Sequence, residues 1–252
     1  MTDLSINLNK IALIRNSRVT TTPDVVEYAK LCIDSGGDGI TVHPRPDQRH
    51  IRAQDCRDLR QALAVELNIE GNPFAGPAPS SRSDVGDYPG FLTLVEELRP
   101  AQVTLVPDSD TQLTSDHGFD VAKDGERLAP IIDRLKSLGC RVSIFMDPIP
   151  DAMPTVAQIG ADRIELYTES YARAHAADDY GHVLSAFQET ALAARAEGLG
   201  INAGHDLNLR NLPDFKIQDL AEVSIGHAFT ADALRWGIPA TIERYQAALG
   251  KH

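Results

Sequence analysis

Two histidines and two glutamates lie at or near the ends of short apolar segments in this 252-residue chain. His43 ends the segment GITVH, Glu70 ends ELNIE, Glu165 lies within RIELY, and His205 follows GINAG. Imidazole and carboxyl groups can transfer protons in both directions near neutral pH. A carboxylate at the end of an apolar strand costs free energy unless it is paired or used. We therefore expect acid–base chemistry if the fold brings these segments together.

A second group of residues is suited to binding phosphate. The loop HPRPDQRH holds Arg45, Arg49 and His50, and guanidinium groups bind phosphate through paired hydrogen bonds. Gly226 and His227 precede a predicted helix, whose first backbone N–H groups form an anion site. These two features predict two separate places for small anions.

Further cations follow the first predicted strand. The segment IRNSR contains Arg15, interpreted here as an ordinary solvated arginine, and Arg18, a candidate ligand for an anion. Lys10 is the only lysine predicted beside the carboxyl end of a strand, so a Schiff-base aldolase would have to use it.

Composition excludes several classes of protein. Lys and Arg total 24 against 36 Asp and Glu, which gives a formal net charge of −12 and argues against a nucleic-acid partner. No window approaches the roughly 20 apolar residues of a membrane span, and the N-terminal segment lacks the pattern of a signal peptide. We therefore predict a cytoplasmic protein whose anionic ligands are held by local clusters of cations and amides.

The sequence offers no pattern for a metal or an organic cofactor. Three distant cysteines form neither a disulfide framework nor a CxxC pair, which fits a reducing compartment. No HxH follows the first strand, no carboxylate-rich metal set occurs, and no Rossmann or Walker glycine pattern appears. A metal-dependent hydrolase barrel is therefore poorly supported.

Short β-rich segments alternate with helical patterns along the chain, which is typical of βα units. Glycine followed by Asp and an apolar strand recurs at the helix-to-strand junctions SGGDGITVH and IGADRIELY. We predict one (β/α)8 TIM-barrel domain over residues 1–252, with an open doubly wound sheet as the alternative. The expected strands are 4–8, 39–43, 66–70, 102–106, 141–146, 163–167, 200–203 and 222–225, and the expected helices are 23–35, 53–64, 89–98, 125–138, 180–197 and 230–249.

Residues 71–90 interrupt the alternation of strands and helices with a segment rich in Gly, Pro, Ser and Asp. The segment follows the third strand, where a short loop is usual. It is either a passive surface insertion or a lid over the site, and its place after a strand's carboxyl end favours the lid.

The motifs together resemble the pyridoxine 5'-phosphate synthase family. The matching stretches, in the family's order, are INLNKIALIRNSR, DGITVHPRPDQRHI, LNIE, LTSDHGFDV, RVSIFMD, RIELYTESYA, INAGHDLN and SIGHAF. The resemblance implies a βα barrel with extra helices that assembles into homo-octamers. It also implies condensation of 1-deoxy-D-xylulose 5-phosphate with 3-amino-2-oxopropyl phosphate, which releases phosphate and water and needs no metal or cofactor.

The resemblance also implies roles for particular residues. His43 and Glu70 would be proton acceptors and His205 a proton donor. The residues implied to contact the aminoketone phosphate are Asn7, Arg18, Gly226 and His227, and those implied to contact the deoxyxylulose phosphate are Arg45, His50 and Thr114.

The chain departs from the family's usual pattern in three places. Asn9-Lys10 stands where Asp-His is usual, and Asp206 stands where a glycine usually follows the histidine. We keep Asn9, Lys10 and Asp206 as expected substrate contacts. Segment 71–90 is longer than the family's usual connection.

Two other functions stay open at this point. A phosphosugar lyase or aldolase would form an imine on Lys10 that borohydride traps. A non-catalytic barrel would bind phosphorylated metabolites without turning them over.

Overall fold

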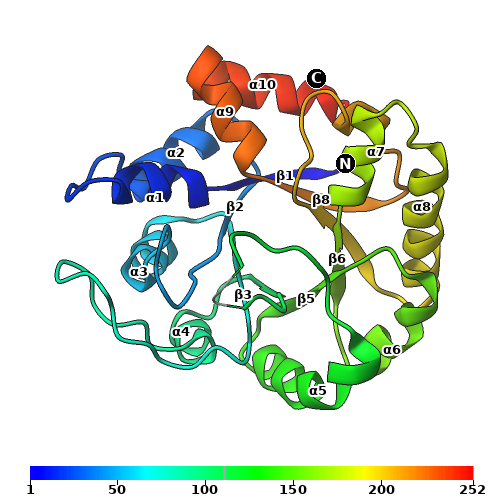
Figure 1. The fold of residues 1–252 in the computed structure, drawn as a ribbon, viewed down its shortest axis with the longest axis horizontal. Helices are drawn as coiled ribbons and strands as arrows, with labels where there is room; N and C mark the ends of the chain where they lie inside the picture. Colours follow the sequence, from blue (N-terminus) through cyan, green and yellow to red (C-terminus); the bar gives the residue numbers. More distant parts are fainter. Residues whose placement is uncertain (110–111, 252) are drawn as a thin grey trace.

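A computed structural model describes residues 1–109 and 112–251 of the chain. Eight parallel strands close into a barrel in chain order, with helices around the outside (Figure 1). The predicted (β/α)8 TIM barrel with extra helices is therefore confirmed, and the open-sheet alternative is wrong. The strands are β1 (Asp3–Asn7), β2 (Gly39–Val42), β3 (Glu66–Gly71), β4 (Gln102–Leu105), β5 (Arg141–Met146), β6 (Arg163–Tyr167), β7 (Gly200–Gly204) and β8 (Leu220–Ile225).

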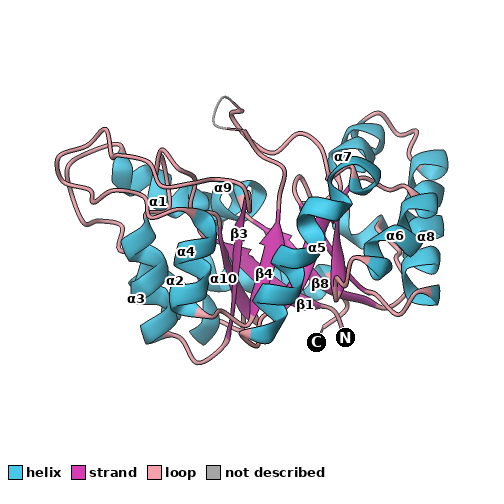
Figure 2. Cartoon of the chain, turned by 90° about the horizontal axis from the view of Figure 1, so that it is seen from below, coloured by secondary structure: helices cyan, strands magenta, loops and turns pink. Residues whose placement is uncertain are grey.

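The α-helices lie outside the barrel and include several that the sequence analysis did not predict. Both termini lie at the end of the barrel opposite the strand arrowheads (Figure 2). The helices are α1 (Asn9–Asn16), α2 (Val25–Asp34), α3 (Ala53–Ala62), α4 (Phe91–Leu98), α5 (Val121–Ser137), α6 (Met153–Gln158), α7 (Glu169–Ala176), α8 (Gly181–Ala196), α9 (His227–Trp236) and α10 (Ile238–Ala248), with short 3-10 turns at Pro150–Ala152 and Leu212–Asp214.

Three differences from the predicted helices affect the site. Helix α1 begins at Asn9, directly after β1, where a loop was expected. The predicted helix 230–249 is two helices, because Gly237 adopts a φ of +76° and Pro239 follows at the start of α10. Helix α9 begins at His227, three residues before the predicted start near Thr230, so Gly226 caps its N-terminus.

The strands place polar side chains inside the barrel and apolar side chains against the helices. Inside the barrel, Ser5 Oγ lies 2.7 Å from Thr41 Oγ1, and Thr104 Oγ1 donates to Asn68 Oδ1 at 3.1 Å. Their apolar neighbours, such as Ile6, are fully buried in the layer between sheet and helices. Because side chains alternate across a strand, this pattern aims polar groups along the barrel axis toward both mouths.

No helix within residues 1–109 and 112–251 combines the length and the apolar character needed to cross a bilayer.

Candidate active site

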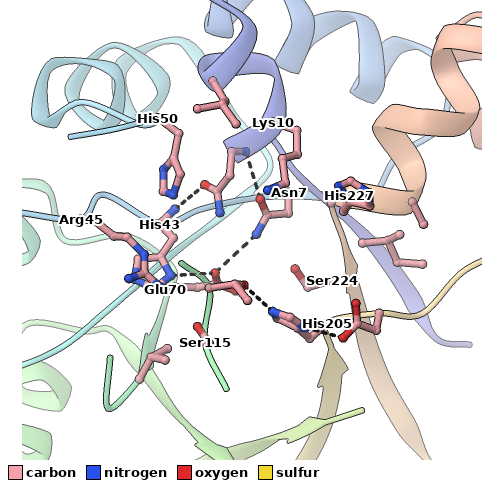
Figure 3. A pocket seen from close by; sticks show the side chains of 18 of the residues that line it. Asn7, Lys10, His43, Arg45, His50, Glu70, Ser115, His205, Ser224 and His227 are labelled. Carbon is pink, nitrogen blue, oxygen red and sulfur yellow. Dashed lines mark hydrogen bonds and ion pairs between the residues drawn. The ribbon is translucent and has the colours of Figure 1, made fainter. Parts of the chain in front are cut away.

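A cavity of about 350 Å³ opens at the carboxyl ends of the strands, the end at which TIM barrels place their chemistry. Figure 3 shows side chains from β1, β3, β8 and α9, and from the residues that follow β2 and β7, around this cavity. Every predicted site residue except Arg18 lines this cavity. These are Asn7, Asn9, Lys10, His43, Arg45, His50, Glu70, Thr114, His205, Asp206, Gly226 and His227.

Arg18 lies elsewhere. It is exposed just past the C-terminus of α1, where its backbone N–H donates to Arg15 O at 3.3 Å. Arg18 follows the end of α1 at Asn16 and is not among the residues that line the cavity. Its contact with a substrate phosphate stays a prediction.

Two asparagines connect the ends of three strands. Asn7 Oδ1 accepts the backbone N–H of Asn9 at 3.0 Å, and Asn7 Nδ2 donates to Glu70 Oε2 at 3.4 Å. Asn9 Oδ1 accepts the backbone N–H of His43 at 2.9 Å. Asn9 thus fixes the position of the His43 backbone, and Lys10 faces the cavity from the first turn of α1.

His43 lies between two buried carboxyl groups. Its Nδ1 is 3.7 Å from Glu70 Oε2, and its Nε2 is 3.4 Å from Asp108 Oδ2. Burial, and after it the charges of Arg45 and Arg49, lower the pKa of His43 to about 3. The imidazole is therefore neutral at ordinary pH and can accept a proton.

Two carboxyl groups inside the mouth of the barrel, those of Glu70 and Glu165, have raised pKa values. Burial raises the pKa of Glu70 well above its ordinary value, and the negative charges of Glu165 and Asp108 raise it further. Burial also raises the pKa of Glu165 to about 7, although a hydrogen bond from Thr104 opposes that rise. The raised pKa makes each carboxylate a stronger base, and Glu165 gains and loses its proton in the range where an enzyme operates.

Asp108, which the sequence analysis did not single out, organises the loop that follows β4. Its Oδ2 accepts hydrogen bonds from Arg45 and, at 3.1 Å, from Ser115 Oγ. Arg45 also donates to the carbonyl of Gln112 at 3.2 Å, which brings Thr114 to the cavity. The sequence signal that could have identified Asp108 is its place two residues after the predicted strand 102–106, in VPDSD.

Arg15 is buried and paired, so its interpretation as a solvated arginine was wrong. Its guanidinium makes two hydrogen bonds to Asp55, at 2.5 and 2.9 Å, and one to the carbonyl of His50 at 3.2 Å. His50 Nδ1 accepts the backbone N–H of Ile51 at 2.9 Å, and burial lowers the pKa of His50 well below its ordinary value. Neutral His50 therefore presents a donating Nε2–H.

His205 has a partner at each ring nitrogen. Nε2 lies 2.8 Å from Thr114 Oγ1, and Nδ1 lies 2.8 Å from Asp206 Oδ2. The ring of Tyr167 meets the imidazole edge to face, with centroids 5.1 Å apart. His205 lies across the cavity mouth from His43 (Figure 3).

The N-terminus of α9 forms the opposite wall. Gly226, His227 and Ala228 line the cavity, and the first N–H groups of a helix have no partner within it. A Cβ on Gly226 would lie only 3.1 Å from Asn7 Cβ, so the absence of a side chain allows α9 to approach β1. An anion can therefore bind between this helix end and Asn7.

Segment 71–90 packs beside the barrel and contributes none of the cavity-lining residues. Gln48 Nε2 donates to Gly86 O at 2.7 Å, and Arg82 donates to the carbonyl of Asn16 at 3.0 Å. These contacts anchor the segment near α1 and α3 and do not support the lid interpretation. The loop after β4 contributes Leu113, Thr114 and Ser115 to the cavity instead.

The described residues, 1–109 and 112–251, contain no group of three or more His, Cys, Asp or Glu side chains arranged to hold a metal ion.

The barrel and its cavity define a TIM-barrel protein with an acid–base site at the carboxyl ends of its strands. A family model described as "Pyridoxal phosphate biosynthesis protein PdxJ" matches residues 4–251. The chain belongs to this family.

Relatives of the chain carry a synthase name, and solved structures share its fold. The chain is 53% identical over 253 residues to the pyridoxine 5'-phosphate synthase of Xanthomonas campestris pv. campestris, covering 98% of this chain and 96% of the relative. The enzyme of the same name from Xylella fastidiosa is 52% identical over 249 residues, covering 97% and 93%. Phosphoribosylanthranilate isomerase from Thermotoga maritima shares the fold at a TM-score of 0.57 and 15% identity, covering 98% of this chain and 100% of that one.

Proposed function

We propose that this protein is a pyridoxine 5'-phosphate synthase. It condenses 1-deoxy-D-xylulose 5-phosphate with 3-amino-2-oxopropyl phosphate and closes a pyridine ring, releasing phosphate and water. The observation that carries the proposal is one cavity that combines proton-transferring groups with an arginine loop and a helix N-terminus. Family membership and relatives at about 53% identity carrying that name support it.

The chemistry needs several proton transfers more than it needs a strong nucleophile. Imine formation, dehydration and aromatisation each remove one proton and deliver another. His43 is neutral, and the raised pKa of Glu70 makes its carboxylate a stronger base, so both serve as proton acceptors. His205, on the opposite side of the mouth, donates protons from Nε2 to the leaving oxygen atoms.

The two anion sites take the two phosphates. Asn7, Gly226 and His227 hold the aminoketone phosphate at the N-terminus of α9. The deoxyxylulose phosphate binds near His50, Arg45 and Thr114, with Lys10 adding positive charge. Arg18 has no part in this proposal, because it lies outside the cavity.

Turnover with both substrates tests the proposal. The purified chain should form pyridoxine 5'-phosphate, detected after chromatography, and release phosphate only when both substrates are present. His43→Ala and His205→Ala should each lower kcat by about 10²- to 10⁴-fold, the usual contribution of a general acid or base. His182→Ala, which changes an exposed histidine on α8, should keep normal turnover.

Other outcomes identify the alternatives. Normal turnover in both cavity variants would refute the assigned roles. Borohydride trapping of substrate on Lys10 would favour a lyase or aldolase, and binding of both substrates without product would favour a non-catalytic barrel.

Three further properties belong to the proposal. Residues 1–252 act as one barrel domain, the barrels assemble into octamers, and the protein works in the cytoplasm. The family resemblance supports the octamer, and the acidic composition and three unpaired cysteines support the location.

A further inference from the structure

Asp206 turns its side chain back onto the residue before it in the chain. The carboxylate Oδ2 lies 2.8 Å from Nδ1 of His205, while Nε2 of the same ring lies 2.8 Å from Thr114 Oγ1 at the cavity. One ring nitrogen is therefore occupied by a carboxylate and the other faces the place where substrate binds (Figure 3).

The backbone at this pair is held in an uncommon conformation. His205 and Asp206 have φ angles of +74° and +54°, in the left-handed region that side chains rarely adopt. Hydrogen bonds hold both carbonyls: Thr168 Oγ1 and the N–H of Leu207 donate to His205 O, and Asn211 Nδ2 donates to Asp206 O at 3.1 Å. Such strain persists only where surrounding contacts enforce it, and here it aims the imidazole into the cavity.

We infer that Asp206 is a positioning residue for His205. By accepting Nδ1–H, its carboxylate fixes the ring orientation and tautomer, so that Nε2 faces the substrate and exchanges a proton there. The inference rests on the proposed function, in which His205 is the proton donor. It replaces the expectation that Asp206 itself contacts substrate, because the carboxylate is already paired with His205.

Other ionisable groups also face His205, and they do so without hydrogen bonds to it. Glu165 of β6, Asp108 after β4 and His43 after β2 interact with His205 through space. Tyr167 packs against the His205 ring, and the charge of His227 of α9 contributes to the lowered pKa of Asp206. The hydrogen bond with His205 is the first cause that lowers the pKa of Asp206, so the carboxylate is charged in the working range.

Two variants of the full chain test the inference. Asp206→Ala removes both the acceptor and the charge and should lower kcat about tenfold or more, with the KM of each substrate changed less than about twofold. Asp206→Asn keeps an acceptor but loses the charge, so its kcat should lie between those of wild type and Asp206→Ala.

A spectroscopic measurement separates positioning from general stability. The nitrogen shifts of His205, assigned by comparison with His205→Ala, should show a proton fixed on Nδ1 in the wild type and a tautomer mixture in Asp206→Ala. The matched control is Asp214→Asn, which alters another Asp–His pair, with His175 Nε2 3.0 Å away and neither residue at the cavity. It should leave kcat and the KM of each substrate unchanged.

Unchanged kcat in Asp206→Ala, or a change confined to KM, would overturn the inference. If His205→Ala is inactive while Asp206→Ala has wild-type kcat, this inference is wrong and the proposed function stands. A fully active His205→Ala would sink the role of His205 in the proposed function. If wild type lacks turnover, the tautomer measurement still decides whether Asp206 fixes the ring.

Discussion

At the scale of single residues, the same side-chain types have different roles because their surroundings differ. His43 is fully desolvated and neutral, whereas His205 is partly exposed and bonded to a carboxylate. Glu66 and Glu70 lie on one strand, yet Glu66 pairs with Arg141 at the amino end of the barrel and Glu70 faces other carboxyl groups at the carboxyl end. Burial and neighbours, rather than residue type, thus decide which group exchanges protons near neutral pH.

The raised pKa of Glu70 gives a pH-dependent prediction. A proton acceptor works only when deprotonated, so activity should be lost as pH falls through the raised pKa of Glu70. The acid limb of kcat/KM should therefore lie above the ordinary glutamate range near about pH 4.3. Glu70→Gln should lower kcat by about 10²- to 10⁴-fold with an unchanged circular dichroism spectrum.

Glu66→Gln is the matched control, because it changes a carboxyl group of the same strand away from the cavity. It should keep kcat and the acid limb of the wild type. Normal turnover in Glu70→Gln, or an acid limb at the ordinary glutamate range, would contradict the assignment of Glu70 as a proton acceptor.

Site residues at the ends of predicted strands could be identified from the sequence. Residues whose role depends on a partner far away in the sequence could not. His43, Glu70 and His205 each lie at or just past the end of a recognisable strand, so their convergence could be predicted from parallel topology. Arg15 was misread because its partner, Asp55, is 40 positions away along the chain. The role of Asp108 likewise depends on Arg45, which comes from another loop.

At the scale of elements, helix starts decide where substrate can bind. Helices α1 and α9 each begin directly beside a strand end, so their first turns border the cavity. Sequence patterns place helix ends poorly, because capping here uses no side-chain hydrogen bond at Leu8 or Gly226. The strands were therefore predicted well from the sequence, whereas the residues of α1 were predicted to form a loop.

The close approach of α9 to β1 predicts the effect of Gly226→Ala. The new Cβ would lie 3.1 Å from Asn7 Cβ and 3.2 Å from Asn7 Oδ1, so Asn7 or the start of α9 must shift by a few tenths of an ångström. Hydrogen bonds from the helix N-terminus to an anionic group would weaken, by about 1.5–3 kcal/mol if one is lost. The KM for 3-amino-2-oxopropyl phosphate should rise about tenfold or more, measured by initial rates with the other substrate saturating.

Gly181→Ala at the start of α8 is the control, since a Cβ there meets no atom within 4 Å. It should leave both KM values unchanged. An equal rise in both KM values for Gly226→Ala would show that the α9 terminus does not discriminate between the two phosphates.

At the scale of the whole molecule, the barrel keeps a polar interior although polar groups are costly to bury. Gln102 of β4 donates to Glu222 of β8 at 3.4 Å, and Asn202 of β7 donates to the same carboxyl at 3.5 Å. The alternation of polar and apolar residues could be read from the sequence, as in LSINL of β1. Which face turns inward could not, because that depends on closure of the sheet and on the helices that cover its outer face.

This polar interior makes stability depend on pH. Burial, and then the charges of Glu66 and Glu165, raise the pKa of Glu222 to about 8. Between roughly pH 4.5 and 8 the folded chain keeps a proton on Glu222 that the unfolded chain has released, so the free energy of unfolding falls as pH rises. Glu222→Gln removes this loss of stability at higher pH and can keep both hydrogen bonds. The control is Glu126→Gln, at an exposed position of α5.

Urea denaturation at pH 5 and pH 8 measures the effect. The stability of Glu222→Gln relative to wild type should be greater at pH 8 than at pH 5, by more than about 1 kcal/mol, since one unit of pKa shift corresponds to about 1.4 kcal/mol. Glu126→Gln should show the same difference from wild type at both pH values. A pH-independent difference for Glu222→Gln would mean that Glu222 is ionised inside the barrel, with Arg163 and Arg141 compensating its charge more fully than its burial opposes it.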